Sequence, residues 1–294
     1  RAYGHTRDAM FISIFANILN IIGNAISLYG FFGLPVLGIA GVAASSAFSQ
    51  FAACIILAIR IRQKSDIAFP LQNWKAIPSS IYRVILGIGV PTAGENLSYN
   101  VAQIVIMVMV TSFGTGAMSA MVYTQTIARF VGVFGLAIGA ATQIKVGYWV
   151  GAKKSENAYR SVFRYQFVAT ACTMFFLVII NIFKTPIIAL FTDDIEISHL
   201  VYRLLLFSIY LDFGRSLNLV TISALKGAGD VRFPVLYGLF SMWVIMVLGS
   251  YFLGIVANFG LVGIWFAIGS DETIRGIVML FRWKSKKWMT KQLA

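Results

Sequence analysis

Eight apolar runs follow one another along the chain, each long enough to cross a bilayer as a helix, which takes about 20 residues. They cover residues 8–30, 34–60, 81–112, 117–148, 160–183, 196–224, 233–256 and 260–282. A soluble domain carries about 25% charged residues, whereas only 12% of these 294 residues are charged and 59% are hydrophobic. Backbone polar groups in a bilayer have to bond within their own segment. The sequence therefore predicts an all-α polytopic membrane protein with about eight transmembrane helices.

Lysine and arginine gather in alternate connections between these runs. The basic connections include residues 60–64, 153–154 and 226–232, whereas the connections at 30–38 and 111–117 contain no charge. This alternation follows the positive-inside rule and predicts a multi-pass protein of the cell membrane with both chain ends in the cytoplasm. The net charge of +13 would also suit a nucleic-acid-binding protein. Because no basic domain stands apart from the apolar runs, we expect no nucleic acid partner.

The chain contains few residues that bind metals or perform covalent chemistry. Its two cysteines, Cys54 and Cys172, lie inside apolar runs, and its two histidines, His5 and His199, lie at the ends of runs. The sequence has no Cys/His cluster, nucleophile elbow or phosphate-binding loop. We therefore expect no metal and no cofactor. A membrane-embedded enzyme or a receptor scaffold is a less favoured class, because a catalytic role needs a convergent set of acid, base or metal.

A short hinge segment at 224–234 interrupts two apolar runs. Its hinge residues are Gly227, Gly229, Asp230 and Arg232. The segment occurs twice at a constant offset of 225 residues, which aligns Arg1 with Lys226, Gly4 with Gly229 and Arg7 with Arg232. The register continues over about sixty positions, which indicates a duplicated helix-hinge-helix unit in parallel orientation.

The duplication predicts how the chain is organised. Residues 61–80 break the apolar pattern and are expected to form a cytoplasmic linker between two lobes. Residues 1–60 would then be the last two helices of the first lobe, 81–283 a second lobe of six helices, and 284–294 a basic cytoplasmic tail. Four runs precede the hinge in the second unit and none precedes it in the first. We therefore expect an N-terminally truncated sequence of a protein with two lobes of six helices each.

Four motifs, taken in order, resemble one family of transporters. They are Asn17-Ile-Leu-Asn-Ile-Ile-Gly-Asn24, Gly89-Val-Pro-Thr-Ala-Gly-Glu95, Leu225-Lys-Gly-Ala-Gly-Asp-Val-Arg-Phe-Pro234 and Asp271-Glu-Thr-Ile-Arg275. Their order and spacing, over essentially the whole chain, resemble the multidrug and toxic compound extrusion (MATE) family. The resemblance implies a twelve-helix fold in which two six-helix lobes face each other across a central cavity.

The same resemblance implies a function, which is that of a secondary active transporter rather than an enzyme. Such a protein exports organic cations or other amphiphilic small molecules by antiport with H⁺ or Na⁺. A lipid-linked oligosaccharide flippase of the same superfamily is the alternative. Arg129, Arg203 and Arg215 keep that alternative open, because a pyrophosphate group needs a cationic cavity. We expect the transported molecule and membrane lipids as partners, and a monomer.

Glu95 is the first candidate for binding a cation. It lies one turn after Pro91 in an apolar run, and polar residues follow it at helical spacing: Asn96, Tyr99, Asn100 and Gln103. This spacing predicts one polar stripe, which in a membrane faces a cavity or another helix. A lone acid at that depth costs roughly 3 kcal/mol on insertion scales, which favours cation binding over a structural carboxylate. Neutralising Glu95 would bend the helix at Pro91, whose ring removes one backbone hydrogen bond.

Asp212 is the second candidate, with Arg215 three residues later and Asn218 three residues beyond that. The spacing places all three on one face of a helix and predicts an Asp212–Arg215 ion pair that neutralises both charges. Direct binding of a cation or substrate stays open, because ionisable residues within a membrane are candidates for function.

Asn20, Asn24 and Ser46 form a third candidate group, in the first unit. They match positions that, in sodium- or proton-coupled relatives, surround an acidic residue. The favoured interpretation is structural, because asparagine and serine commonly join membrane helices by hydrogen bonds.

Two acids and an arginine stand together in the last apolar run. Arg275 follows Asp271 by four residues and Glu272 by three, so both acids are expected to pair with it in a structural network, with gating as the alternative. Arg129 is alone in its run and needs a partner. Glu95 is one candidate for that partner.

Overall fold

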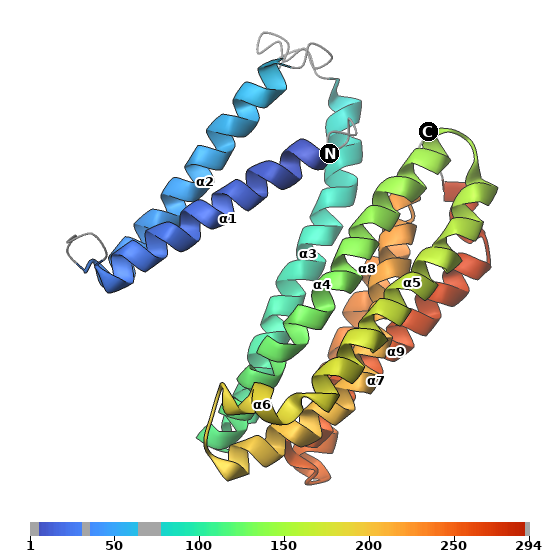
Figure 1. The fold of residues 1–294 in the computed structure, drawn as a ribbon. Coiled ribbons are helices and arrows are strands. Elements are labelled where there is room, and N and C mark those ends of the chain that lie inside the picture. The colour runs from blue at the N-terminus through green and yellow to red at the C-terminus, as the bar shows by residue number, and fades with distance from the viewer. Residues whose placement is uncertain (1–5, 31–35, 64–77, 292–294) are drawn as a thin grey trace. The chain divides into compact units, whose positions relative to one another are not determined.

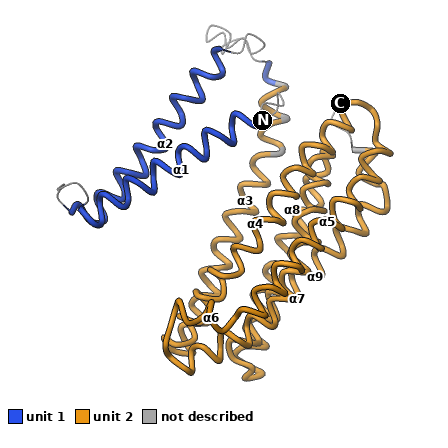
Figure 2. The backbone as a smooth tube through the Cα atoms, in the orientation of Figure 1, with its two compact units in different colours: residues 1–79 blue, residues 80–294 orange. Residues whose placement is uncertain are grey.

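The computed structural model describes residues 6–30, 36–63 and 78–291, and within these ranges the chain is almost entirely helical and contains no β-strand. The predicted all-α class is therefore confirmed. The chain forms two compact units, Arg1–Ser79 and Ser80–Ala294 (Figure 2). Several expectations fall outside the described residues. They concern most of the linker at 61–80, the last residues of the tail, and the hinge-copy residues Arg1 and Gly4.

The first unit contains two long helices, α1 (Thr6–Tyr29) and α2 (Gly38–Gln63), which lie side by side (Figure 1). Small residues line their interface. A Cβ atom added to Gly23 would lie 2.7 Å from Ser45 Oγ. The two backbones can approach closely only because neither helix carries a large side chain there, as is usual for helix pairs in membranes.

The second unit is a bundle of helices built around α7. Its elements are α3 (Ser79–Thr111), α4 (Thr115–Gly151), α5 (Ser155–Ile182), the short α6 (Lys184–Ala189), α7 (Ile195–Gly227), α8 (Arg232–Ser241), the π-helical turns η3 (Met242–Leu248) and η4 (Tyr251–Val256), α9 (Gly260–Lys284), and the 3₁₀ turn η5 (Lys287–Lys291). Helix α7 packs against α4, α5 and α9 (Figure 1). The central position of α7 matters because it carries Asp212, Arg215, Asn218 and Lys226.

Six of the eight predicted spans are long and apolar enough to cross a membrane by length and composition. They are Arg7–Tyr29, Gly38–Gln63, Thr115–Gly151, Ser155–Ile182, Ile195–Gly227 and Arg232–Val256. The other two predicted spans are α3 and α9, which have 33 and 25 residues. Their length suffices, but α3 carries Glu95 with its polar neighbours and α9 carries Asp271, Glu272 and Arg275. Charged and polar groups lower the apolar character of a helix and mark it for function in a membrane.

Helices α7 and α9 approach each other at two glycines. A Cβ atom added to Gly214 would lie 2.2 Å from Thr273 Oγ1 and 2.6 Å from the backbone nitrogen of Thr273. A Cβ atom added to Gly276 would lie 2.8 Å from Leu217 Cβ. Only glycine fits at these points. The close contact brings the middle of α7 within reach of the acidic side chains of α9.

The start of the predicted basic tail folds back onto the bundle. The indole of Trp288, in η5, is fully buried and stacks on that of Trp283, with ring centroids 4.2 Å apart and an angle of 6° between the planes. Lys286 precedes η5 with a positive φ of 57°. Its ammonium lies 2.9 Å from Glu156 Oε2 and 4.4 Å from the ring centroid of Tyr159. These contacts fasten η5 to α5 and α9.

Candidate functional site

Seven charged side chains approach one another in the interior of the second unit. Four are carboxylates and three are cations, and they come from α3, α7 and α9: Glu95, Asp212, Asp271, Glu272, Arg215, Lys226 and Arg275. We call this set the charged network. Charged groups that leave water need partners of opposite charge, because the desolvation penalty is several kcal/mol per ion.

Glu95 pairs with Lys226 across the interface of α3 and α7. Glu95 Oε2 lies 2.8 Å from Lys226 Nζ, and the two side chains are 12% and 19% exposed. The candidate partner Arg129 is therefore wrong for Glu95. Arg129 is exposed on α4, and no ion pair joins it to a described residue. The sequence offered no local signal for the correct partner, because 131 positions separate Glu95 from Lys226.

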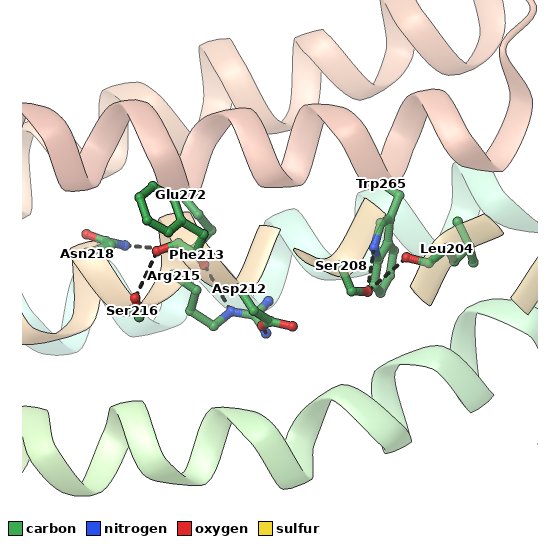
Figure 3. A network of polar contacts seen from close by, with 9 residues as sticks. All are labelled: Leu204, Ser208, Asp212, Phe213, Arg215, Ser216, Asn218, Trp265 and Glu272. Atoms are coloured by element: carbon green, nitrogen blue, oxygen red, sulfur yellow. Dashed lines mark hydrogen bonds and ion pairs between the residues drawn. The ribbon is translucent and has the colours of Figure 1, made fainter. Parts of the chain in front are cut away.

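Arg215 forms the predicted ion pair with Asp212 and a second one with Glu272. Arg215 Nη1 donates to Asp212 Oδ1 at 3.0 Å, and Arg215 Nε lies 3.6 Å from Glu272 Oε1. Asn218 Nδ2, one turn further along α7, donates to Glu272 Oε2 at 2.7 Å (Figure 3). The side chain of Arg215 points towards Asp212, and that of Asn218 points towards Glu272 (Figure 3). The predicted Asp212–Arg215 contact within one helix is thus confirmed, and it extends to α9.

The expected pairing of Arg275 with both acids of α9 is wrong in part. Arg275 Nη2 donates to Asp271 Oδ2, and Ser241 Oγ of α8 donates to Asp271 Oδ1. Glu272 instead turns to Arg215 and Asn218. Consecutive residues of an α-helix point about 100° apart because a turn takes 3.6 residues. Asp271 and Glu272 therefore face different neighbours, and each finds its partners on the side it faces.

Two buried oxygen atoms of α7 lack a hydrogen-bond partner among the described residues. They are Asp212 Oδ2 and Asn218 Oδ1, and both side chains flank the Arg215–Glu272 contact. The charged network as a set also carries four carboxylates for three cations. A buried acceptor without a donor is costly. Asp212 Oδ2 and Asn218 Oδ1 are therefore buried acceptors without a described donor, beside a set of side chains with one more carboxylate than cations.

The predicted polar stripe on α3 is divided between two environments. Glu95 is buried against α7, whereas Asn96 and Asn100 are exposed and joined by a hydrogen bond from Asn100 Nδ2 to the carbonyl of Asn96 at 2.9 Å. Tyr99 is 36% exposed. Gln103 is half-buried. The spacing predicted one face, but the 100° step between neighbours turns Asn96 and Asn100 away from Glu95.

The candidate residues of the first unit form a seam of hydrogen bonds between α1 and α2. Asn20 Nδ2 donates to Ser46 Oγ at 3.0 Å and lies 3.4 Å from Ser49 Oγ. Asn24 Nδ2 donates to Asn20 Oδ1 at 3.1 Å. These contacts fit the structural interpretation, in which asparagines join neighbouring helices.

The hinge between α7 and α8 is held by an arginine that sequence reasoning did not select. Arg282 Nε donates to Asp230 Oδ2 at 2.8 Å, and the guanidinium lies 4.7 Å from the ring centroid of Phe233. Gly229 adopts a positive φ of 89°, which favours glycine. Arg232 is exposed and begins α8. Lys226 and Ser241 were also missed as partners of the candidate acids, because their contacts depend on how distant helices pack.

Comparison with known proteins shows the family to which this chain belongs. A sequence profile described as MatE matches residues 91–252, which is more than half of the chain. "Uncharacterized transporter YisQ" of Bacillus subtilis (strain 168) is 37% identical over 294 residues, covering 100% of this chain and 65% of that protein. "Probable multidrug resistance protein NorM" of Bacillus thuringiensis subsp. konkukian (strain 97-27) is 28% identical over 269 residues, covering 91% of this chain and 59% of the relative. The chain thus spans about two thirds of the length of these relatives or less.

Solved structures share the fold. The crystal structure of a MATE protein in the straight conformation matches with a TM-score of 0.85 at 18% identity, covering 98% of this chain and 64% of that one. An outward-facing multidrug resistance MATE family transporter of the MOP superfamily matches with a TM-score of 0.85 at 19% identity, covering 97% of this chain and 63% of that one. The family profile, the relatives and the shared fold agree: this multi-pass membrane protein belongs to the MATE family.

Proposed function

We propose that the protein exports organic cations or other amphiphilic small molecules by antiport, with H⁺ or Na⁺ as the coupling ion. One observation carries the proposal. The charged network holds one more carboxylate than cations, and Asp212 Oδ2 is buried without a hydrogen-bond partner among the described residues. An antiporter needs such a group, because it has to bind a positive charge in one state and release it in another.

The network would act as one acceptor rather than as separate acids. Arg215 contacts Asp212 and Glu272, and Asn218 donates a hydrogen bond to Glu272. A proton or monovalent cation that binds at Asp212 would therefore weaken the hold of Asp212 on Arg215 and strengthen that of Glu272. Energetic coupling between two sites is carried by networks of side chains that can adopt two discrete arrangements.

The exposed side of α3 would meet the transported molecule. Asn96, Tyr99 and Asn100 are exposed there, next to the exposed apolar side chain of Leu97. Amides, an aromatic ring and apolar surface together suit an amphiphilic cation, because an aromatic face attracts positive charge. The NorM relatives are described as probable multidrug resistance proteins, which supports the same class of substrate.

Pro91 would provide the bend that alternating access requires. It lies inside α3, one turn before Glu95, and a proline within a helix leaves one backbone carbonyl without its usual donor. Release of Glu95 from its neighbours would free the preceding half of α3 to tilt. In this proposal both chain ends are cytoplasmic and the protein acts as a monomer without a cofactor, in contact with membrane lipids.

A lipid-linked oligosaccharide flippase is a second candidate. Arg129 on α4 and Arg203 on α7 are exposed side chains without an ion pair to any described residue. A guanidinium in that state can bind a pyrophosphate with two parallel hydrogen bonds. Such a protein would move labelled lipid-linked pyrophosphate between leaflets and would leave efflux of organic cations unchanged.

Efflux from proteoliposomes tests the proposal. The full-length protein is reconstituted into proteoliposomes, which are loaded with tetraphenylphosphonium. Proton and sodium gradients are then imposed in separate experiments. We expect efflux with one of the two gradients, and at least tenfold slower efflux for Asp212→Asn. Glu156→Gln is the matched control, because Glu156 lies in an exposed pair outside the charged network. The proposal would be overturned by an efflux rate that neither gradient changes, or by an efflux rate that is the same in Asp212→Asn and the wild type.

A further inference from the structure

We infer that Lys226 is a tethered cation that occupies the Glu95 carboxylate, so that an organic cation or coupling ion has to displace the lysine in order to bind there. The inference rests on the proposed transport function and assigns Lys226 as a positioning residue for it. Its basis is the contact of Glu95 Oε2 with Lys226 Nζ at 2.8 Å.

The Glu95–Lys226 pair lies where α3 joins the bundle. Glu95 is the first buried residue among the described side chains of α3, and the residues before it are exposed or half-buried. Further along, Ala102, Ile106 and Val110 are buried in the apolar core of the second unit. The ion pair is therefore the tether at the boundary between the packed part of α3 and the part that contains Pro91.

The remaining space around the Glu95 carboxylate is already restricted. A Cβ atom added to Gly238 on α8 would lie 3.2 Å from Glu95 Oε1 and 3.9 Å from Arg275 Nη1. Arg275 is itself held by Asp271. Glu95 Oε1 and Arg275 Nη1 thus lie beside the same residue of α8, so an added cation at Glu95 would meet the positive charge of Lys226 and lie near that of Arg275. Like charges a few ångströms apart repel strongly when water is largely excluded. Binding of a cation at Glu95 therefore competes with the Glu95–Lys226 ion pair.

Lys226 is placed so that it can leave without a large change in the backbone. It lies in the last turn of α7, next to Gly227. A Cβ atom added to Gly227 would lie 2.5 Å from the carbonyl oxygen of Gln143, so the end of α7 is fixed against α4. The lysine side chain is long and can withdraw its ammonium towards water while its methylene groups stay packed. The negative end of the α7 dipole stabilises the ammonium after release.

The tethered cation sets an affinity that can be measured. When the competent state of a site is only a fraction of the population, the apparent dissociation constant rises by the inverse of that fraction. A lysine that holds Glu95 for about 90% of the time weakens cation binding about tenfold. Removal of the lysine should then tighten binding of the cation and slow its release, so that the affinity rises while the transport rate falls.

The test uses full-length protein in nanodiscs for binding and in proteoliposomes for transport, with radiolabelled tetraphenylphosphonium as the probe. We expect Lys226→Met to lower the apparent Kd about tenfold and to lower the maximal transport rate. Lys226→Arg, which keeps the charge, should stay within about twofold of the wild type. In a Glu95→Gln background, Lys226→Met should change neither quantity. Lys287→Met is the matched control, because Lys287 is an exposed lysine outside the charged network.

Two results would overturn the inference. One is a Kd that Lys226→Met leaves unchanged or raises. The other is an equal decrease of Kd in the Glu95→Gln background, because Lys226 would then act only as a general positive charge. Lys226→Gln takes the place of Lys226→Met if the latter does not fold.

Failure of the proposed function gives a different pattern. In that case wild-type protein neither binds nor transports tetraphenylphosphonium, and sodium becomes the probe. The melting temperature of each protein is then measured in NaCl and in choline chloride. The tethered lysine predicts that the increase in NaCl is larger for Lys226→Met than for the wild type or for Glu95→Gln/Lys226→Met. An equal effect of NaCl on all three proteins would overturn the tethered lysine itself.

Discussion

Arg215 Nε lies 3.6 Å from Glu272 Oε1, and this ion pair joins the middle of α7 to the middle of α9. The same guanidinium holds Asp212 Oδ1 at 3.0 Å. Arg215 is therefore a shared cation for two carboxylates, and its loss should do more harm than the loss of either acid. The Asp212 side chain is only 1% exposed, so water cannot replace the arginine at that position.

Arg215→Gln should destabilise the protein more than Glu272→Gln. The substitution leaves two carboxylates facing each other, and we expect it to lower the free energy of unfolding by about 2 kcal/mol, less than for a fully buried pair because Arg215 keeps some contact with solvent. The melting temperature of purified protein in detergent is the measurement. Arg160→Gln is the matched control, since its pair with Glu156 is exposed and contributes little. A melting temperature lowered equally by Glu272→Gln would contradict the shared-cation interpretation.

Asp271→Asn should leave Arg275 charged and buried without a counter-ion. Both side chains are largely inaccessible, at 2% and 7% exposure. Removing one partner of such a pair typically costs about 3 kcal/mol or more, because the remaining charge stays desolvated. The double variant Asp271→Asn/Arg275→Met should recover most of the lost thermal stability. If the double variant melts as low as Asp271→Asn, the cost does not come from the unpaired charge.

Gly214→Ala should force α7 and α9 apart. The added methyl group would lie 2.2 Å from Thr273 Oγ1 and 2.8 Å from its Cα atom, and the backbone of α9 cannot yield as a side chain can. Overpacking of this kind costs about 1–3 kcal/mol. Gly132→Ala on α4 is the control, because no described heavy atom outside its own stretch of helix lies within 4 Å of its added Cβ atom.

Alanine also favours a helix over glycine by about 1 kcal/mol. Gly132→Ala should therefore raise the melting temperature slightly while Gly214→Ala lowers it. A parallel loss of transport in Gly214→Ala, measured by tetraphenylphosphonium efflux, is expected because the Arg215–Glu272 distance depends on the same interface.

Trp288→Ala should release the segment that contains η5. Trp288 is fully buried, stacks on Trp283 and donates from Nε1 to the Trp283 carbonyl at 3.2 Å. Loss of the buried contact of a short element such as η5 opens that element locally rather than unfolding the whole protein. Trypsin should therefore cleave after Lys286 and Lys287 at least tenfold faster, as followed by mass spectrometry. Thr290→Ala, an exposed position in η5, should leave the rate unchanged. Equal rates for Trp288→Ala and the wild type would exclude this role of the stack.

Local spacing predicted what a single helix determines. The apolar runs gave the positions of the helices, because a bilayer-length run can satisfy its backbone only within itself. The Asp212–Arg215 pair followed from a spacing of three residues, which brings two side chains onto one helix face. Local spacing did not predict that Glu95 is buried while Asn96 and Asn100 are exposed, nor that Arg275 pairs with Asp271 alone of the two acids of α9. Both depend on which neighbour lies on each side of the helix.

The sequence by itself thus determined an all-α membrane protein of duplicated pattern and the candidate acids within it. The tertiary structure alone decided the partners of those acids: Lys226 for Glu95, Arg215 for Glu272 and Arg282 for Asp230. The physical reason is that contacts within a helix follow from its fixed pitch. Contacts between helices depend on their rotation and shift, which close packing at residues such as Gly214 and Gly276 sets.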